Sequence, residues 1–151
     1  MYERILVPTD GSAGTAHVAL QAIDLATQYD APIHVLHVLP DGGVLGGGAD
    51  EERRERSQRV VERLARMADV HDVDAETAIR EGDPATEILD YAEEVGADLI
   101  VAGTHGRTGV GRRVIGSVAE RLVRHADCPV MTVRLPETDV TVTEADQARD
   151  L

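Results

Sequence analysis

The chain has 151 residues, a hydrophobic fraction of 42% and a formal net charge of −13, from 28 acidic and 15 basic side chains. This length predicts one domain with a substantial core, and the excess of negative charge argues against nucleic acid and anionic membranes as partners. No apolar run is long enough to span a bilayer, and the first residues lack the regions of a signal peptide, so we expect a cytoplasmic protein without a membrane partner.

The first half of the chain predicts a strand, a helix, a second strand and a second helix. Apolar, β-branched runs indicate the strands, and apolar residues at helical spacing indicate the helices. Ser12 is a candidate N-cap for the first helix, which we expect to end near Tyr29. The predicted ranges are strands at residues 4–8 and 33–39, a glycine-rich loop at 40–50 and a long amphipathic helix at 51–70.

The second half of the chain predicts three more strands and two more helices. Asp83 is the expected N-cap of a helix with Pro84 in its first turn, and Gly96 is the residue expected to end that helix. The predicted ranges are an edge strand at residues 74–80, strands at 98–102 and 129–134, and a last helix that ends near residue 125. We divide the chain into a domain at residues 1–135 and an acidic tail at 136–151.

The alternation of strands and helices predicts an α/β fold of the open, Rossmann-like kind. Right-handed crossovers place helices on both faces of a parallel sheet. Ligands of such sheets bind beyond the carboxyl ends of the strands, at the point where the strand order reverses. If the first and fourth strands are neighbours, Thr9 and Asp10 meet the segment that follows residue 102.

That segment is rich in glycine and lies between a buried strand and a helix. Its pattern is Gly103, Gly106, Gly116 and Ser117, and such a loop lets the backbone approach an anion while the helix N-terminus offers N–H groups to it. Residues 117–120 also fit a capping box, which needs no ligand. The two interpretations are compatible, and the pattern alone leaves phosphate binding open.

The other candidate groups are weaker. Asp10 is placed to bind the divalent cation of a polyphosphate, but the spacing alone slightly favours an Asx turn that leads into a helix. A Walker A motif is absent because no lysine follows the glycines, and no dinucleotide fingerprint follows the first strand. His105 lies in the loop and either reaches a phosphate or faces solvent. The single cysteine, Cys128, is expected to be a packed thiol rather than a nucleophile.

The basic residues have an unusual composition, because all of them are arginine. An acidic surface without lysine suggests adaptation to high salt, which screens self-repulsion. A genome that favours arginine codons is the alternative explanation. Arg107, Arg112 and Arg113 place local positive charge in the glycine loop, which suits an anion.

Four separated motifs, in order, make the chain resemble the universal stress protein family over about residues 2–134. The first is the opening strand and turn at residues 5–12, and the second is the sequence at 82–84. The third is the strand at 97–103. The last is the glycine pattern described above, which matches the family's ATP-binding pattern, together with the segment at 116–130.

The resemblance implies a five-stranded parallel sheet in the order 3-2-1-4-5 and a homodimer formed through the fifth strand. It implies kinship with the ATP-binding branch of the family, with Mg²⁺ as the accompanying ion. By position, the residues expected to bind the nucleotide are Pro8, Thr9, Asp10, Val38, Gly103, Gly106, Gly116, Ser117 and Val118, with Asp10 also serving the metal.

The leading hypothesis from the sequence is therefore an ATP-binding stress-response or regulatory module with slow or no hydrolysis. No residue stands out as a general base or as a cationic finger, so we expect at most a weak ATPase. The alternatives are a nucleotide-dependent enzyme of a related α/β fold and a structural dimer that binds no nucleotide.

Overall fold

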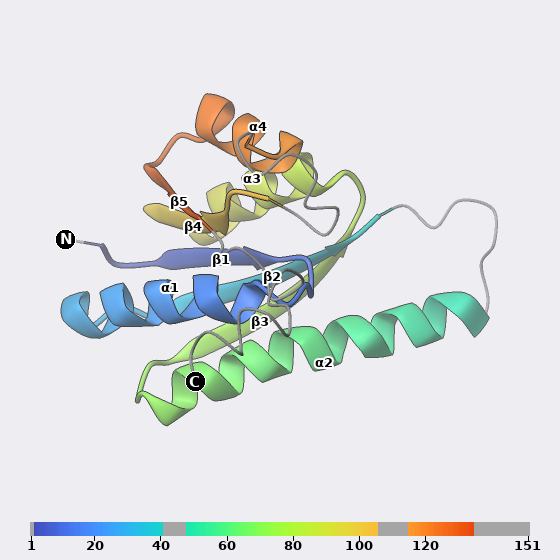
Figure 1. The fold of residues 1–151 in the computed structure, drawn as a ribbon, viewed down its shortest axis with the longest axis horizontal. Helices are drawn as coiled ribbons and strands as arrows, with labels where there is room; N and C mark the ends of the chain where they lie inside the picture. Colours follow the sequence, from blue (N-terminus) through green and yellow to red (C-terminus); the bar gives the residue numbers. More distant parts are fainter. Residues whose placement is uncertain (1, 41–47, 106–114, 135–151) are drawn as a thin grey trace, which may run out of the picture.

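The computed structural model describes residues 2–40, 48–105 and 115–134 and contains a five-stranded parallel sheet with helices on both faces (Figure 1). The sheet order is β3-β2-β1-β4-β5, which confirms the order that the family resemblance implies. The elements are β1 (Ile5–Thr9), α1 (Thr15–Tyr29), β2 (Ile33–Leu39), α2 (Gly48–Val70), β3 (Ala75–Glu81), α3 (Pro84–Val95), β4 (Leu99–Gly103), α4 (Ser117–His125) and β5 (Val130–Val133).

β1 is the central strand and the most deeply buried. Ile5, Leu6 and Val7 are fully shielded from solvent. Ile5 lies opposite Ile33 of β2 on one side and Leu99 of β4 on the other. Such apolar runs are typical of parallel strands that are covered on both faces.

The sheet separates two apolar cores. One core lies under α1 and α2, which contribute residues such as Ile23 and Leu64. The other lies under α3 and α4, with Ile88 and Leu122 among its members. Figure 1 shows this division, with α1 and α2 below the sheet and α3 and α4 above it.

Several predicted element boundaries are confirmed. Asp83 caps α3, since its carboxylate accepts a hydrogen bond from the Thr86 N–H at 3.1 Å, and Pro84 begins the helix. Gly96 ends α3 with a positive φ of 68°, which glycine adopts without strain. α1 ends at Tyr29 as expected.

Two predictions at helix starts are wrong. Ser12 does not cap α1, because the N-cap is Gly14 and no side chain makes a capping bond there. The Ser12 N–H instead bonds the Asp10 carboxylate, which holds Ser12 in the turn before the helix. α2 begins at Gly48, three residues before the expected start at 51, so the loop after β2 is shorter than predicted.

Some predictions concern residues outside the described part of the chain. These are Gly106 and the loop arginines Arg107, Arg112 and Arg113, together with the tail at 136–151. In the described residues, no helix is both long enough and apolar enough to span a membrane.

Candidate functional site

A cavity of about 670 Å³ opens at the carboxyl ends of the strands. It is the place where the parallel order reverses between β1 and β4, as the rule for open α/β sheets predicts. Every expected site residue that the structure describes lines this cavity: Pro8, Thr9, Asp10, Val38, Gly103, Gly116, Ser117 and Val118. The fold therefore brings together three segments that are far apart in the sequence.

The turn after β1 is held by its own side chains. Thr9 is 8% exposed, and its hydroxyl accepts the Gly11 N–H at 3.1 Å and donates to the hydroxyl of Thr15 at 3.0 Å. Asp10 Oδ1 accepts the Ser12 N–H at 2.9 Å, which is an Asx turn. The Asx-turn interpretation of Asp10 is thus correct, and it leaves Oδ2 without a hydrogen-bond partner among the described residues.

Gly11 connects this turn to α2. Its φ of +79° lies in the left-handed region that glycine tolerates. A Cβ at this position would come within 3.2 Å of Val60 Cγ2. The close approach of the backbone to α2 therefore requires glycine.

α4 begins at the cavity without a side-chain cap. Gly116 is the N-cap, with φ −63° and ψ 158°, and Ser117 already belongs to the helix. The expected capping box is wrong, because the N-cap position belongs to Gly116, which has no side chain, and no side-chain capping bond forms there. Gly116 donates its N–H to the Thr104 carbonyl at 2.6 Å, which joins the start of α4 to the end of β4.

The absence of a capping side chain has an electrostatic consequence. The first-turn N–H groups of a helix carry partial positive charge and need acceptors. Gly116, Ser117 and Val118 all line the cavity. The Gly116 N–H already bonds the Thr104 carbonyl, so an anion in the cavity would meet the N–H groups of Ser117 and Val118 at the helix N-terminus.

Sequence reasoning missed the contribution of α2. One face of this helix lines the cavity through residues spaced three and four apart, namely Arg53, Arg56, Ser57, Val60 and Arg63. The charge pattern predicts an amphipathic helix, but it does not indicate that part of the polar face turns toward a ligand site. That knowledge depends on the crossover from β2, which the sequence alone does not position.

A hydrogen bond between half-buried His37 and buried Ser57 fixes α2 to the sheet at this point. His37 Nδ1 and Ser57 Oγ are 2.8 Å apart and hydrogen-bonded, and Ser57 is 1% exposed. Arg53 donates to the Pro40 carbonyl at 2.6 Å, which also ties the helix to the end of β2. Both contacts set the distance between α2 and the other walls of the cavity.

The remaining lining is largely apolar and suits the face of a planar ring. The residues come from both sides of the site and are Leu36, Val38, Leu39, Ile88, Ala102 and Leu122. Ligand sites of this size usually combine such apolar walls with a few polar groups. Here the polar groups are the Asx turn, the start of α4 and the arginines of α2.

The charge of the lining is opposite to that of the chain. Among the described lining residues the arginines are Arg53, Arg56 and Arg63, and the only carboxylate is that of Asp10. The whole chain has a net charge of −13. A concentration of positive charge in an acidic protein favours an anionic ligand.

The described residues contain no group of three or more His, Cys, Asp or Glu side chains that could hold a metal ion. Asp10 is the one carboxylate among the described residues that line the cavity. This is compatible with Mg²⁺, which commonly binds one or two carboxylates together with phosphate oxygens and water.

Of the two remaining candidate residues from the sequence, His105 lies at the cavity and Cys128 does not. His105 lines the cavity, and its Nδ1 lies 3.0 Å from the Thr104 hydroxyl. Cys128 packs against the core under α3 and α4. Burial, followed by the charge of Asp98, raises the pKa of the Cys128 thiol, so it stays protonated and a poor nucleophile.

The fold and the cavity define an α/β domain with a ligand site at the switch point of a parallel sheet. The sequence profile of the universal stress protein family matches residues 1–134, and the chain belongs to this family.

Comparisons with individual proteins agree with this family assignment. Universal stress protein MJ0531 of Methanocaldococcus jannaschii is 37% identical over 92% of this chain and 86% of its own length. The structure of UspA from Lactobacillus plantarum has a TM-score of 0.78 at 26% identity, covering 88% of this chain and 98% of that one. A universal stress protein from Archaeoglobus fulgidus, solved in complex with dAMP, has a TM-score of 0.68 at 26% identity, covering 87% and 97%.

Proposed function

We propose that this protein binds ATP and acts in the cytoplasm as a stress-response or regulatory module, with slow or no intrinsic hydrolysis. The observation that carries the proposal is that one cavity joins apolar walls, the N-terminus of α4 without a side-chain cap, and arginine side chains. Apolar walls suit an adenine ring, and the other two features suit phosphates. The dAMP complex of the Archaeoglobus fulgidus relative supports an adenine nucleotide as the ligand.

Mg²⁺ is the proposed companion of ATP, with Asp10 as its protein ligand. The Asx turn uses Oδ1 of this carboxylate and directs the residue to the cavity. The other oxygen then serves the metal, and phosphate oxygens supply further ligands. The slow hydrolysis that we propose follows from the lining, in which no carboxylate other than Asp10 stands among the described residues.

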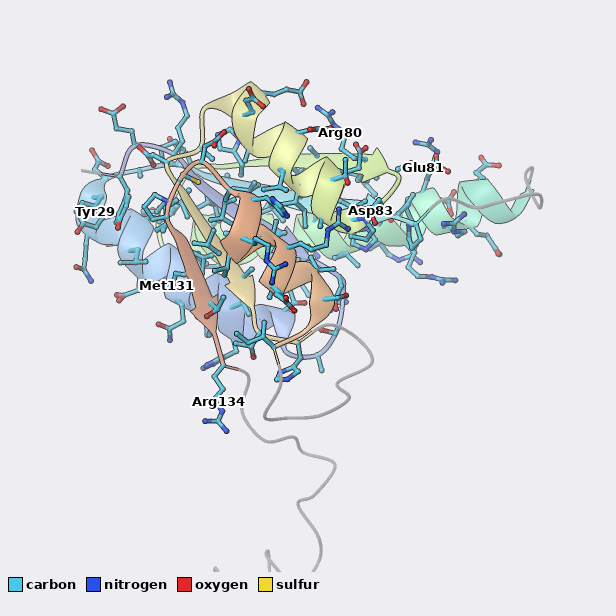
Figure 2. All side chains as sticks on the ribbon, turned by 90° about the horizontal axis from the view of Figure 1, so that it is seen from above. Tyr29, Arg80, Glu81, Asp83, Met131 and Arg134 are labelled. Carbon is cyan, nitrogen blue, oxygen red and sulfur yellow. The ribbon has the colours of Figure 1, made fainter. Side chains whose placement is uncertain are left out.

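We also propose a homodimer formed through β5. This strand is an edge of the sheet, and Met131 on it is 38% exposed (Figure 2). Val123 of α4 is 55% exposed. An apolar edge strand is prone to pair with another strand, and a second copy would cover it by antiparallel pairing about a two-fold axis.

The nucleotide site is tested with Gly116→Val. The Gly116 backbone has a negative φ, so other residues can adopt it and the variant is expected to fold. The added side chain would occupy the place where a phosphate meets α4. In titration calorimetry with Mg²⁺ and ATP, we expect binding by the wild type and a loss of at least about tenfold in the variant.

Gly116→Ala is the graded control, because it adds one methyl group and should cost less affinity than valine. Thermal melting verifies that both variants are folded. Equal ATP affinity in the wild type and a folded Gly116→Val protein would contradict the site. Mass spectrometry of the purified protein provides a second check, since a retained adenine nucleotide would identify the ligand directly.

A further inference from the structure

We propose that Arg56 and Arg63 of α2 make the cavity selective for a long phosphate chain, so that nucleoside triphosphates bind better than monophosphates. The inference rests on the proposed function and adds the residues that distinguish one nucleotide from another. It depends on three observations: the face of α2 that lines the cavity, the lack of ion-pair partners at these arginines, and the position of α2 opposite α4.

Arg56 and Arg63 lie on one side of α2, and that side is held toward the cavity. Arg56 and Arg63 are seven residues apart, which places them on the same side of the helix, roughly 10 Å apart along its axis. Ser57 and Val60 lie between them on the same face, and both line the cavity. Because Ser57 is buried and bonded to His37, the helix has little freedom to turn this face away.

The two arginines differ from the arginines of the described chain that a carboxylate engages, and they differ from the equally unpaired Arg59 and Arg66 in lining the cavity. Arg54 pairs with Glu81 at 3.3 Å, Arg80 with Glu94 at 2.8 Å and Arg124 with Glu120 at 2.8 Å. Arg56 and Arg63 have no ion pair with any residue that the structure describes. In a chain of net charge −13, two cations that line a cavity without a carboxylate partner are suited to an anion from outside.

The position of α2 explains why a ligand with several phosphates should bind better than one with a single phosphate. α2 packs on one face of the sheet and α4 on the opposite face, so the cavity has positive groups on two walls. One phosphate attached to a nucleoside can satisfy the N–H groups at the start of α4. Only a longer phosphate chain can keep that contact and also approach the arginines across the cavity. The selectivity therefore depends on charge at α2 rather than on the glycine loop.

The experiment measures dissociation constants for ATP and AMP with the wild type and with Arg56→Gln, Arg63→Gln and the double variant. Arg59→Gln is the matched control, because Arg59 is an exposed arginine of the same helix that does not line the cavity. We expect the double variant to lose at least about tenfold in ATP affinity, the effect of removing a charge-assisted hydrogen bond. AMP affinity should stay within about twofold, and Arg59→Gln should leave both affinities unchanged.

Each remaining outcome decides between the two proposals. If ATP and AMP bind the wild type and the folded double variant with unchanged affinities, nucleotide binding stands and the role of the arginines is refuted. An equal loss for both nucleotides likewise refutes selectivity. If the wild type binds neither nucleotide, inorganic tripolyphosphate is titrated instead. Binding of tripolyphosphate that depends on Arg56 and Arg63 would keep the arginine site and reject the nucleotide, whereas no binding would reject both.

Discussion

The guanidinium of Arg121 on α4 donates a hydrogen bond to the carboxylate of Asp83 at the start of α3, with 2.8 Å between Nη1 and Oδ2. Nη2 of the same arginine reaches the Thr86 hydroxyl at 3.2 Å. The hydrogen bonds from Thr86, followed by that from Arg121, hold the pKa of Asp83 below its ordinary value. One carboxylate therefore caps α3 and also fixes α4, the helix whose N-terminus lines the cavity (Figure 2 labels Asp83).

We expect Arg121→Gln to weaken ATP binding although Arg121 does not line the cavity, because α4 loses one of the contacts that hold it against α3, while the apolar packing between the two helices remains. Asp83→Asn should lower the melting temperature further, since it also weakens the α3 cap. Arg124→Gln is the control: among the described residues Arg124 pairs with Glu120 of its own helix alone, an exposed pair of the kind that contributes about 0.5 kcal/mol or less. Calorimetry and thermal melting of the three variants check this order, and an Arg121→Gln protein that binds like Arg124→Gln would contradict it.

Asp10→Asn should remove the metal dependence of ATP binding while keeping the fold. The asparagine oxygen can still accept the Ser12 N–H, so the turn after β1 is retained. The lost charge weakens the interaction with Mg²⁺. We expect the gain in ATP affinity on adding Mg²⁺ to fall at least about fivefold, with little change in its absence. Titrations with Mg²⁺ and with a chelator measure the difference, and full metal dependence in the variant would reject the role.

Stability should decrease as the pH falls below the ordinary histidine pKa because of His34. Burial lowers the pKa of this residue below its ordinary value of 6.5, the opposing effect of Glu76 is smaller, and Arg4 acts in the same direction as burial. His34 Nδ1 lies 3.4 Å from Glu76 Oε2 without forming a hydrogen bond, and the ring packs edge-on to Tyr91. The unfolded chain takes up the proton at higher pH than the folded one, so folding is disfavoured as the pH falls from 6.5 to the lowered value.

Urea unfolding at about pH 7.5 and about pH 5.5 measures this effect. His34→Leu removes the titrating group, and we expect a smaller loss of stability between the two pH values than in the wild type. His71, which is exposed, provides the control variant His71→Gln. An unchanged pH dependence in His34→Leu would assign the effect to other groups.

The dimer prediction is tested at β5. Met131→Arg places a like charge on both copies near the two-fold axis of an antiparallel pair, so we expect it to produce a monomer. Light scattering of the wild type, of this variant and of a chain that ends at Pro136 gives the assembly state. A monomeric wild type would rule out the dimer, and loss of the dimer only on truncation would assign the contact to the tail.

The acidic, lysine-free composition predicts a response to salt. If the surface is adapted to high salt, the melting temperature should continue to rise between about 0.2 M and about 3 M KCl. Simple screening is nearly complete at the lower concentration, where the Debye length is already below about 10 Å. A flat profile over that range would favour codon usage as the origin of the missing lysines.

The fold was predictable because it depends on long, periodic segments. The apolar run at Ile33–Leu39 and the Asp83–Pro84 start are local signals that the tertiary structure preserves. The N-cap predictions failed at Ser12 and Ser117, where nearby groups compete. The Asp10 carboxylate takes the Ser12 N–H, and an extended Gly116 places Ser117 inside the helix.

The site was predictable only in part. The residues of the β1 turn and of the α4 start belong to motifs with recognisable spacing. Arg56 and Arg63 belong to no motif, because their role depends on which face of α2 meets the cavity. Their charge is indistinguishable in the sequence from that of Arg59 and Arg66, which do not line it.

α2 divides folding and recognition between neighbouring faces of one helix. One face supplies Val61, Leu64 and Ala68 to the core, whereas the adjoining face lines the cavity from Arg53 to Arg63. The first turns extend past the strands (Figure 1). Substitutions at exposed positions of the lining face, such as Arg56 and Arg63, therefore change the ligand surface while the packed residues stay the same. During evolution, this arrangement lets related proteins acquire different ligand preferences through a few exposed positions, with little risk of losing the folded state.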